Sequence, residues 1–293
     1  MPQGLREEGS GLADALTGGP AVFSKDSTMT AQDILRHCDA GTVWPEPGGA
    51  GFTDLASAYQ TALAVRVLRL QRGESPRGYK IGFTNHLIWP RYQVFAPIWS
   101  SLWNTTVVHC DGAGSLSLAR LCQPRLEPEA VFGFKATPPA GAGPGELFEA
   151  LNWVAPGFEI VQSHQPDWKF TPPQTVADGG LHARLLVGRK VPIADLAQDA
   201  AQLDQLLSRA RVHLHRNGEF VEEGAGANVL GSPLRALKHF LAELRACPGA
   251  ADIAAGDIVT TGTWTDAWPV QEGERWTAHF DAALPALEVS FGR

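Results

Sequence analysis

The spacing of hydrophobic residues along the chain changes near residue 75. Before that point, apolar residues recur every three to four positions at 30–39 and at 54–71, which is the spacing of amphipathic helices. Thr53 stands where it can cap the start of the longer helix, and Gly73 stands where it can end it. We expect this helix to have one apolar face, formed by Leu55, Ala58, Tyr59, Ala62, Leu63 and Leu70.

After residue 75 the pattern changes to short β-like runs that are separated by Gly and Pro. These runs lie at 78–83, 105–110, 126–134, 157–162, 183–187, 211–221, 257–261, 275–281 and 287–291. Asn217 and Gly218 stand between two alternating stretches and predict a tight hairpin. One further helix is predicted at 233–246, and the stretch 138–145, dense in Pro and Gly, is expected to be a surface loop. The chain after residue 75 is therefore predicted to be β-rich.

The first 28 residues differ from both regions. They are rich in Gly, Ser and other small residues, show no sustained hydrophobic period, and predict a disordered extension. The only two methionines are Met1 and Met29, and regular sequence begins directly after the second. Met29 is therefore either an internal residue that follows an extension or the true first residue of the protein.

Composition and charge narrow the class of partner. The chain has 293 residues, of which 44% are hydrophobic, so it can bury a substantial core. Its formal net charge is -7 and it has no run of Lys or Arg, which argues against binding to nucleic acid or to an anionic membrane surface. The four cysteines are far apart and form no Cys-x-x-Cys pair, so neither a zinc ribbon nor a disulfide framework is indicated. The sequence shows no membrane span or signal peptide, and we expect a cytoplasmic protein that acts on a small molecule.

Three glutamates stand in runs that otherwise predict buried strands. Glu127 and Glu129 are separated by one residue, so the pleat of a strand places both side chains on the same face. Glu159 lies in a second apolar run, where a lone charge is unfavourable to bury without a partner. Carboxylates so placed repel one another unless they are solvated, protonated or bridged by a cation. A solvated strand face and a site for Mg²⁺ or Mn²⁺ both fit the spacing alone.

Five short motifs follow one another along the chain in a fixed order. They are GYKIG at 78–82, QPRLEPE at 123–129, Glu159, TVAD at 175–178, and GDIVTTG at 256–262. Their sequence and order resemble the 2-keto-4-pentenoate hydratases, a branch of the fumarylacetoacetate hydrolase superfamily that also contains 2-oxo-3-hexenedioate decarboxylases. The resemblance runs from about residue 30 to residue 291 and does not include the first 28 residues.

The resemblance implies a fold and a cofactor. The implied fold is of the α+β class, a mixed β-roll of the fumarylacetoacetate hydrolase C-terminal type with a small N-terminal helical region, in a homo-oligomer. We therefore divide the chain into a disordered extension (1–28), an N-terminal helical region (29–75) and a metal-binding, β-rich catalytic domain (76–293). The metal ligands of the family fall on Glu127, Glu129 and Glu159, which implies Mg²⁺ or Mn²⁺ at these residues.

Further site residues follow from the same resemblance. Lys80 matches a lysine that points into the site, where it can pair with the substrate carboxylate or transfer a proton. Asp178 is a second candidate for proton transfer, although an Asp before two glycines also commonly caps a turn. Thr261 and Gly262 match the segment that lines the substrate pocket. His164 and His182 are further candidates for the wall of that pocket.

Several positions depart from the pattern of the hydratases. Leu181 stands at a position that is polar in that pattern, and His164 replaces an arginine that could hold a distal acid group of the substrate. Arg125 is expected to form an ion pair elsewhere in the fold. Aromatic residues concentrate near the implied pocket, and half or more of them are expected to be core or oligomer-interface residues. The others predict a bulkier or more apolar substrate tail. The aromatic residues concerned are Trp89, Tyr92, Phe95, Trp99, Trp103, Trp168, Trp264 and Trp268.

The leading functional hypothesis is a metal-dependent lyase that adds water to a 2-oxo-4-enoate or its 2-hydroxydienoate tautomer, in the catabolism of aromatic or related compounds. The metal would bind the 1-carboxylate and the 2-oxygen and stabilise the enolate as a Lewis acid. The same electron sink serves the decarboxylation of a 2-oxo-3-enedioate, which is the nearest alternative. Hydrolysis of a C–C bond in an acylpyruvate and a non-catalytic partner subunit are the remaining alternatives.

Overall fold

The computed structural model describes residues 29–45, 51–85, 89–92, 96–281 and 284–292, with the backbone alone at 91 and 92. The predicted extension 1–28 and Phe95 lie outside the described residues. None of the helices in the described part of the chain has the length and apolar composition of a membrane-spanning segment.

The helices and strands are interspersed along the chain. The helices are α1 (Ala31–Ala40), α2 (Leu55–Gln71), α3 (Trp89–Tyr92), α4 (Pro144–Ala150), α5 (Pro172–Ala177), α6 (Ile193–Leu196), α7 (Ala200–Arg209) and α8 (Pro233–Ala246). The strands of the larger sheet are β1 (Pro76–Gly82), β2 (Ile98–Trp103), β3 (Val107–His109), β5 (Arg125–Phe134), β6 (Leu151–Val161), β7 (His182–Val187), β8 (Val191–Pro192), β11 (Ile258–Thr260) and β12 (Trp268–Pro269). Those of the smaller sheet are β4 (Ala113–Ser117), β9 (Arg211–Arg216), β10 (Glu219–Ala225), β13 (Arg275–Phe280) and β14 (Leu287–Gly292).

The larger sheet curls into a roll. Its strand order is β2-β1-β11-β5-β6-β7-β3, with β12 beside β5 and β8 beside β6. Strands β2 and β3 are at the two ends of this path, yet only the turn 104–106 separates them in sequence. Because three residues can span only about 10 Å, the two ends of the path must lie close together. One face of the sheet is therefore turned inward, and an apolar cluster on it fills part of the interior: Leu102, Val131, Ala155, Leu185, Val187 and Ile258.

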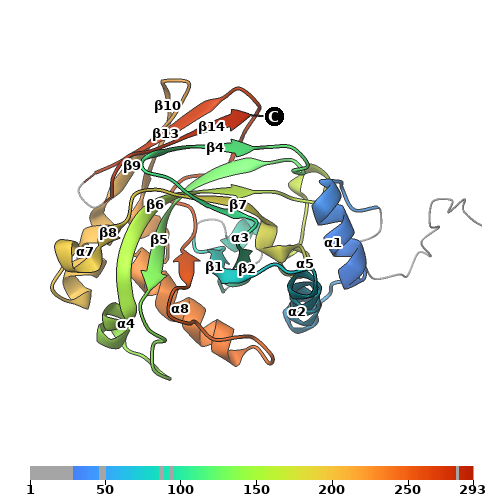
Figure 1. Ribbon diagram of the computed structural model, residues 1–293, viewed down its shortest axis with the longest axis horizontal. Coiled ribbons are helices and arrows are strands. Elements are labelled where there is room, and N and C mark those ends of the chain that lie inside the picture. Colours follow the sequence, from blue (N-terminus) through green and yellow to red (C-terminus); the bar gives the residue numbers. More distant parts are fainter. Residues whose placement is uncertain (1–28, 46–50, 86–88, 93–95, 282–283, 293) are drawn as a thin grey trace, which may run out of the picture.

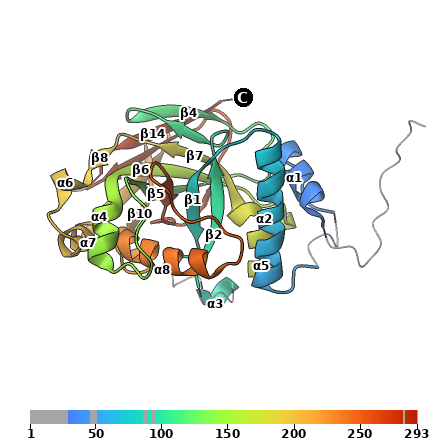
Figure 2. The ribbon, with the colours of Figure 1, turned by 60° about the horizontal axis from the view of Figure 1, so that its bottom comes forward.

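The outer face of the roll is covered by the smaller sheet and by three helices. Figure 1 shows β4, β9, β10, β13 and β14 along one side of the molecule, and Figure 2 shows α4, α7 and α8 on another. The smaller sheet has the order β10-β9-β13-β14-β4. The main hydrophobic core lies between these layers and contains Phe132, Phe158, Phe240, Trp264 and Trp276.

The two N-terminal helices form a separate layer beside α5 (Figure 1). Helix α1 begins with a capping box, in which the Thr30 side chain and Asp33 exchange hydrogen bonds with each other's backbone N–H. Helix α2 is capped by Asp54, whose carboxylate accepts from the Ser57 N–H at 2.8 Å, so the prediction of Thr53 as the cap is wrong. The predicted apolar face of α2 is only partly covered, since Leu55 and Leu70 are exposed.

The predicted α+β roll is confirmed, but several helices and one strand boundary differ from the prediction. Helix α8 was predicted at its observed bounds, and the hairpin at Asn217 and Gly218 is present, with positive φ at both residues. The expectation of a single helix in the β-rich region is wrong, because α4, α5 and α7 also lie there. Strand β6 begins six residues before the predicted start, since Pro156 and Gly157 interrupt its apolar pattern without interrupting its pairing with β5.

Candidate metal centre

Strand pairing brings the three glutamates together on the inner face of the roll. Glu127 on β5 is directly opposite Glu159 on β6, and Glu129 lies two residues further along β5. Residues at these positions point to the same face of the sheet. Each glutamate offers one carboxylate oxygen to a group in which all the oxygens lie within 4.8 Å of one another.

The three carboxyl groups are held in an environment that disfavours their charge. Glu129 and Glu159 are completely buried, whereas Glu127 borders a pocket. Burial, followed by repulsion from the other two carboxylates, raises the pKa of Glu127 to about 8, although Lys80 opposes the shift. Burial likewise raises the pKa of Glu129 and of Glu159. Oxygen Oε1 of Glu129 has no hydrogen-bond partner in the described structure, so the cluster lacks part of the positive charge or donors that would stabilise it.

Lys80 is the nearest cation. It lies on β1, level with Thr260 of the adjacent strand β11, and is almost fully buried. Its Nζ is 3.2 Å from Glu159 Oε2 and donates a hydrogen bond of 2.9 Å to the carbonyl of Gly180. Burial lowers the pKa of Lys80, but the three carboxylates raise it by more, so the pKa lies above its usual value. Lys80 therefore carries a proton beside the carboxylates.

A left-handed backbone segment shapes the surroundings of Lys80. Gly179, Gly180 and Leu181 all have φ near +60°, a conformation that glycine adopts freely and leucine rarely. A Cβ on Gly180 would lie 2.9 Å from Ser100 Cβ and 3.2 Å from Lys80 Cδ. The two glycines of this segment thus allow the Gly180 carbonyl to reach the ammonium group of Lys80.

The strand-end segment after β11 holds Glu129. The N–H of Gly262 donates to Glu129 Oε2 at 2.7 Å, and the Thr260 hydroxyl donates to the same oxygen. A Cβ on Gly262 would lie 1.9 Å from Thr84 Oγ1, so only glycine fits here. The neighbouring Thr261 is fully buried and donates to the carbonyl of Ala130 at 3.0 Å.

His182 contacts the third glutamate. Its Nδ1 is 2.8 Å from Glu159 Oε1 and its Nε2 is 2.9 Å from the hydroxyl of Thr106. Burial, with the nearby charge of Lys80, lowers the pKa of His182 well below its usual value, so the ring is neutral. His182 thus lies behind the carboxylates and borders a separate cavity of about 60 Å³.

Asp178 and His164 form a buried pair. His164 Nδ1 is 2.5 Å from Asp178 Oδ1, the His164 N–H donates to Asp178 Oδ2 at 3.0 Å, and both side chains are buried. Trp44 stacks against the imidazole ring with 6.3 Å between ring centroids. Burial lowers the pKa of His164, but the carboxylate of Asp178 raises it by more. The buried hydrogen bonds between Asp178 and His164 stabilise the fold at this position. The catalytic role of Asp178 remains a prediction.

The His164–Asp178 pair should make stability depend on pH. Because the pKa of His164 is raised in the folded protein, the pair stabilises fully below about pH 6.5 and loses its effect as the pH rises through the folded value. We expect Asp178→Asn to lower the free energy of unfolding by about 3 kcal/mol at pH 6 and by less at pH 9. Denaturant titrations at the two pH values measure this difference. Asp195→Asn, at an exposed position on α6, is the control, and an equal loss at both pH values would contradict the expectation.

A pocket of about 160 Å³ opens beside Lys80 and Glu127. Its wall is mixed. Apolar surface comes from Phe83, Ile98, Val161, Trp168, Phe170 and Leu181, and polar groups come from Thr84, Asn85, Thr263, Thr265 and Asp266. Arg125 also lines it, with its guanidinium 4.2 Å from the centroid of the Trp168 ring. The expectation that Arg125 acts elsewhere is wrong, because Arg125 is two residues before Glu127 on β5 and shares its face.

The structure groups the predicted site residues into two sets. Lys80, Glu127 and Gly262 line the pocket, and Glu129 and Glu159 lie against Glu127. Thr261, His164, His182 and Asp178 do not belong to its lining among the described residues, so their assignment to substrate contact or catalysis remains a prediction. Of the predicted aromatic residues, Trp168 lines the pocket, whereas Trp99, Trp103 and Trp264 are buried elsewhere.

A divalent cation fits these residues. Three clustered carboxylates supply the hard oxygen ligands that Mg²⁺ and Mn²⁺ prefer. The raised pKa values and the unpartnered oxygen of Glu129 are what such a cluster shows without its cation. The partly exposed Glu127 would leave the cation accessible from the pocket.

Comparisons with known proteins agree with this geometry. No family model matches the chain. The chain is 31% identical to 2-hydroxyhexa-2,4-dienoate hydratase of Comamonas testosteroni over 75% of its length and 80% of the relative. It is 33% identical to 4-oxalocrotonate decarboxylase of Pseudomonas sp. strain CF600 over 77% and 81% of the two chains.

A solved structure is similar over most of the chain. The 4-oxalocrotonate decarboxylase of Pseudomonas putida G7, in complex with magnesium and adipate, superimposes with a TM-score of 0.76 at 28% identity. The match covers 89% of this chain and 95% of that one.

Proposed function

The chain belongs to the family of 2-keto-4-pentenoate hydratases and 4-oxalocrotonate decarboxylases in the fumarylacetoacetate hydrolase superfamily, and from this premise we propose that it hydrates a 2-hydroxydienoate with Mg²⁺ or Mn²⁺ at Glu127, Glu129 and Glu159. The observation that carries the proposal is the meeting of three carboxylates and Lys80 at the base of one pocket. When bound, the cation would act as a Lewis acid on the 2-oxo acid end of the substrate.

The remaining chemistry is assigned to residues of the chain. Hydration of a 2-hydroxydienoate requires loss of the 2-hydroxyl proton, protonation at C5, and addition of water as hydroxide at C4 and a proton at C3. Lys80 carries a proton on Nζ and borders the pocket, so it is the candidate for donating or returning these protons.

The lining of the pocket favours an apolar substrate tail. Leu181, Phe83, Phe170 and Trp168 present hydrocarbon and aromatic surface to the pocket, and contact between apolar surfaces contributes roughly 25 cal/mol per Å² buried. A 2-hydroxydienoate with a methyl or longer alkyl end should therefore have a lower KM than the unsubstituted pentadienoate.

A substrate panel with Mn²⁺ tests the hydratase assignment. We expect ¹H NMR to show new C–OH methine signals with the 2-hydroxydienoates, and none when the metal is removed by a chelator. Turnover that is unaffected by the chelator would overturn the metal-dependent proposal. Release of CO₂ from a 2-oxo-3-enedioate without hydration would identify a decarboxylase, and no reaction with any compound would favour a non-catalytic partner subunit.

Arg125 is the specific observation that favours the decarboxylase alternative. Arg125 lines the pocket with its guanidinium over the ring of Trp168, and a guanidinium there could bind a second carboxylate at the far end of a dicarboxylic substrate. If the enzyme acts on an enedioate, we expect Arg125→Gln to lower kcat/KM for that compound by about 10- to 100-fold, the scale of 1.5–3 kcal/mol for a hydrogen bond to a charged group. Its kcat/KM for a monocarboxylic dienoate should change much less. Arg189→Gln, at an exposed position, serves as the control.

The proposal also includes a small-molecule 2-oxo acid as the partner, a homo-oligomeric state and a cytoplasmic location. The relatives named above act on such small acids. The absence of Lys or Arg runs and the net charge of -7 support a protein without nucleic-acid or membrane partners.

A further inference from the structure

His182 reaches Glu159 because of an irregularity in strand β7. In the pairing of β6 with β7, Glu159 is opposite Leu185 and Ile160 is opposite Arg184, but Val161 is opposite His182 rather than Ala183. The extra residue is a β-bulge, which inverts the alternation of side chains beyond it. Ala183 accordingly packs in the main core, while His182 turns to the inner face with Glu159.

The turn that closes the roll supplies the second contact of His182. Thr106 is buried, and its hydroxyl lies 2.9 Å from His182 Nε2. A carboxylate that binds a cation is ionised and can only accept hydrogen bonds. Nδ1 of His182 must then donate to Glu159, which leaves Nε2 as an acceptor for the hydroxyl of Thr106. The carbonyl of Trp103 is a second acceptor for that hydroxyl at 3.2 Å, and His182 Nε2 is the nearer of the two at 2.9 Å.

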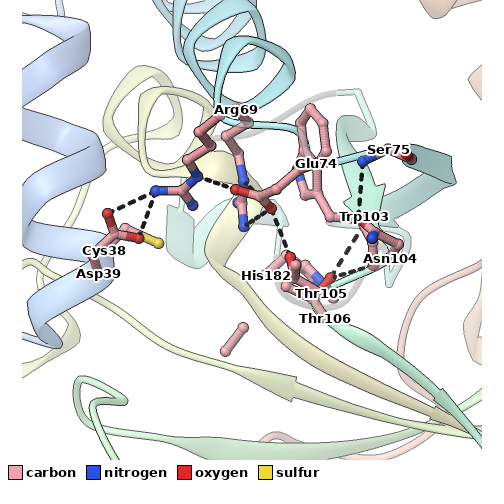
Figure 3. Close-up of polar contacts among 12 residues, drawn as sticks. Cys38, Asp39, Arg69, Glu74, Ser75, Trp103, Asn104, Thr105, Thr106 and His182 are labelled. Atoms are coloured by element: carbon pink, nitrogen blue, oxygen red, sulfur yellow. Dashed lines mark hydrogen bonds and ion pairs between the residues drawn. The ribbon is translucent and has the colours of Figure 1, made fainter.

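The position of Thr106 is fixed from both sides of the turn. Its carbonyl accepts from the Leu185 N–H at 2.8 Å, which ties the turn to β7. On the other side, the Thr105 hydroxyl donates to Glu74 at 2.6 Å and the Ser75 N–H donates to Asn104 at 2.8 Å. Glu74 is itself held by an ion pair with Arg69 of α2. Figure 3 shows Glu74 between Arg69 and Thr105, with Thr106 and His182 beside the turn.

We propose that Thr106 and His182 are positioning residues that fix the carboxylate of Glu159 in its metal-binding orientation. The inference rests on the proposed metal-binding function of the three glutamates. His182 Nδ1 contacts Oε1 of Glu159 at 2.8 Å, whereas Oε2 has no hydrogen-bond partner among the described residues and only lies 3.2 Å from the Lys80 ammonium. The hydrogen bond with His182 is therefore the contact that sets the plane of the carboxylate. Loss of the Thr106 hydroxyl leaves the imidazole held on one side only, and the orientation of Glu159 becomes less defined.

The test compares three variants in the same turn. Thr106→Val keeps the shape of the side chain but removes the hydroxyl, and we expect its Kd for Mn²⁺ to rise about 10- to 100-fold. Thr106→Ser retains the hydroxyl and should restore a Kd near that of the wild type. Thr105→Val removes the neighbouring hydroxyl, which contacts Glu74 and not His182, so it should lower the melting temperature without changing the Kd. The concentration of free Mn²⁺ is measured by electron paramagnetic resonance. At saturating Mn²⁺, the kcat of Thr106→Val should recover most of the wild-type value.

The outcomes separate this inference from the proposed function. If the wild type binds Mn²⁺ and Thr106→Val binds it equally well, the positioning role is overturned while the metal site stands. A similar loss of affinity in Thr105→Val would show that the turn acts only through general stability, and it would also overturn the role. If the wild type itself binds no Mn²⁺, the proposed function fails and the inference falls with it. His182→Phe provides a second variant, and a wild-type Kd in that protein would likewise exclude the role.

Discussion

Replacement of Glu127, Glu129 or Glu159 by glutamine is expected to lower turnover by more than about 10³-fold and to weaken Mn²⁺ binding while the protein stays folded. Each change removes one charged oxygen from a group whose members lie within 4.8 Å of one another. The expected size follows from the several kcal/mol that a catalytic metal contributes to the transition state. Turnover is measured by ¹H NMR and metal affinity by electron paramagnetic resonance of free Mn²⁺.

The same variants should make the metal-free protein more stable at neutral pH. The pKa of Glu127 is about 8 in the folded protein and near 4.5 when unfolded. When the pKa of a carboxyl group is higher in the folded than in the unfolded protein, the free energy of unfolding falls as the pH rises between the two pKa values, here from about 4.5 to about 8. Glu127→Gln removes this loss, so its free energy of unfolding should depend less on pH in that range. Glu219→Gln, at an exposed position on β10, is the control, and unchanged Mn²⁺ affinity in all three site variants would reject the assignment.

The sequence alone predicts the direction of those side chains that follow simple strand alternation. Glu127 and Glu129 could be placed on one face from their spacing, and the structure places them on one face. The same alternation places Arg125 on that face, and the structure has Arg125 and Glu127 in the lining of one pocket. The pairing of β5 with β6, which brings Glu159 opposite Glu127, depends on contacts between residues 32 positions apart. The sequence singles out Glu159 through the cost of burying a lone charge, and the family resemblance implies that it is a ligand, but neither predicts its place opposite Glu127.

The sequence does not predict the direction of a side chain where an irregular backbone determines it. The bulge at Ala183 turns His182 toward Glu159, and no local pattern in the sequence indicates it. Thr106 joins the site because the roll closes through the turn 104–106, which is a property of the whole sheet. The replacement of an arginine by His164 predicts the loss of a group for a distal acid, and this prediction is untested. What the sequence does not predict is that His164 pairs with Asp178 and does not belong to the lining of the pocket among the described residues.

Lys80→Met is expected to reduce kcat by about 10²- to 10⁴-fold, the usual scale for the loss of a general acid or base. The ammonium group lies 3.2 Å from Glu159 Oε2 and borders the pocket, so it is within reach of both the carboxylates and the substrate. Methionine has a similar length and retains the packing of the stem against Gly180. No carboxylate is lost, and the removal of a positive charge beside three carboxylates should leave Mn²⁺ affinity unchanged or increase it.

Steady-state kinetics at saturating Mn²⁺ separates the two roles that the position of Lys80 allows. If Lys80 transfers a proton in the transition state, kcat and kcat/KM should fall together in Lys80→Met. If Lys80 only pairs with the substrate carboxylate, KM should rise while kcat changes little. Lys238→Met, at an exposed position on α8, controls for the loss of a lysine elsewhere in the fold. A near-normal kcat in Lys80→Met would exclude proton transfer and assign Lys80 to substrate binding, whereas a loss of Mn²⁺ binding would mean that Lys80 maintains the arrangement of the three glutamates.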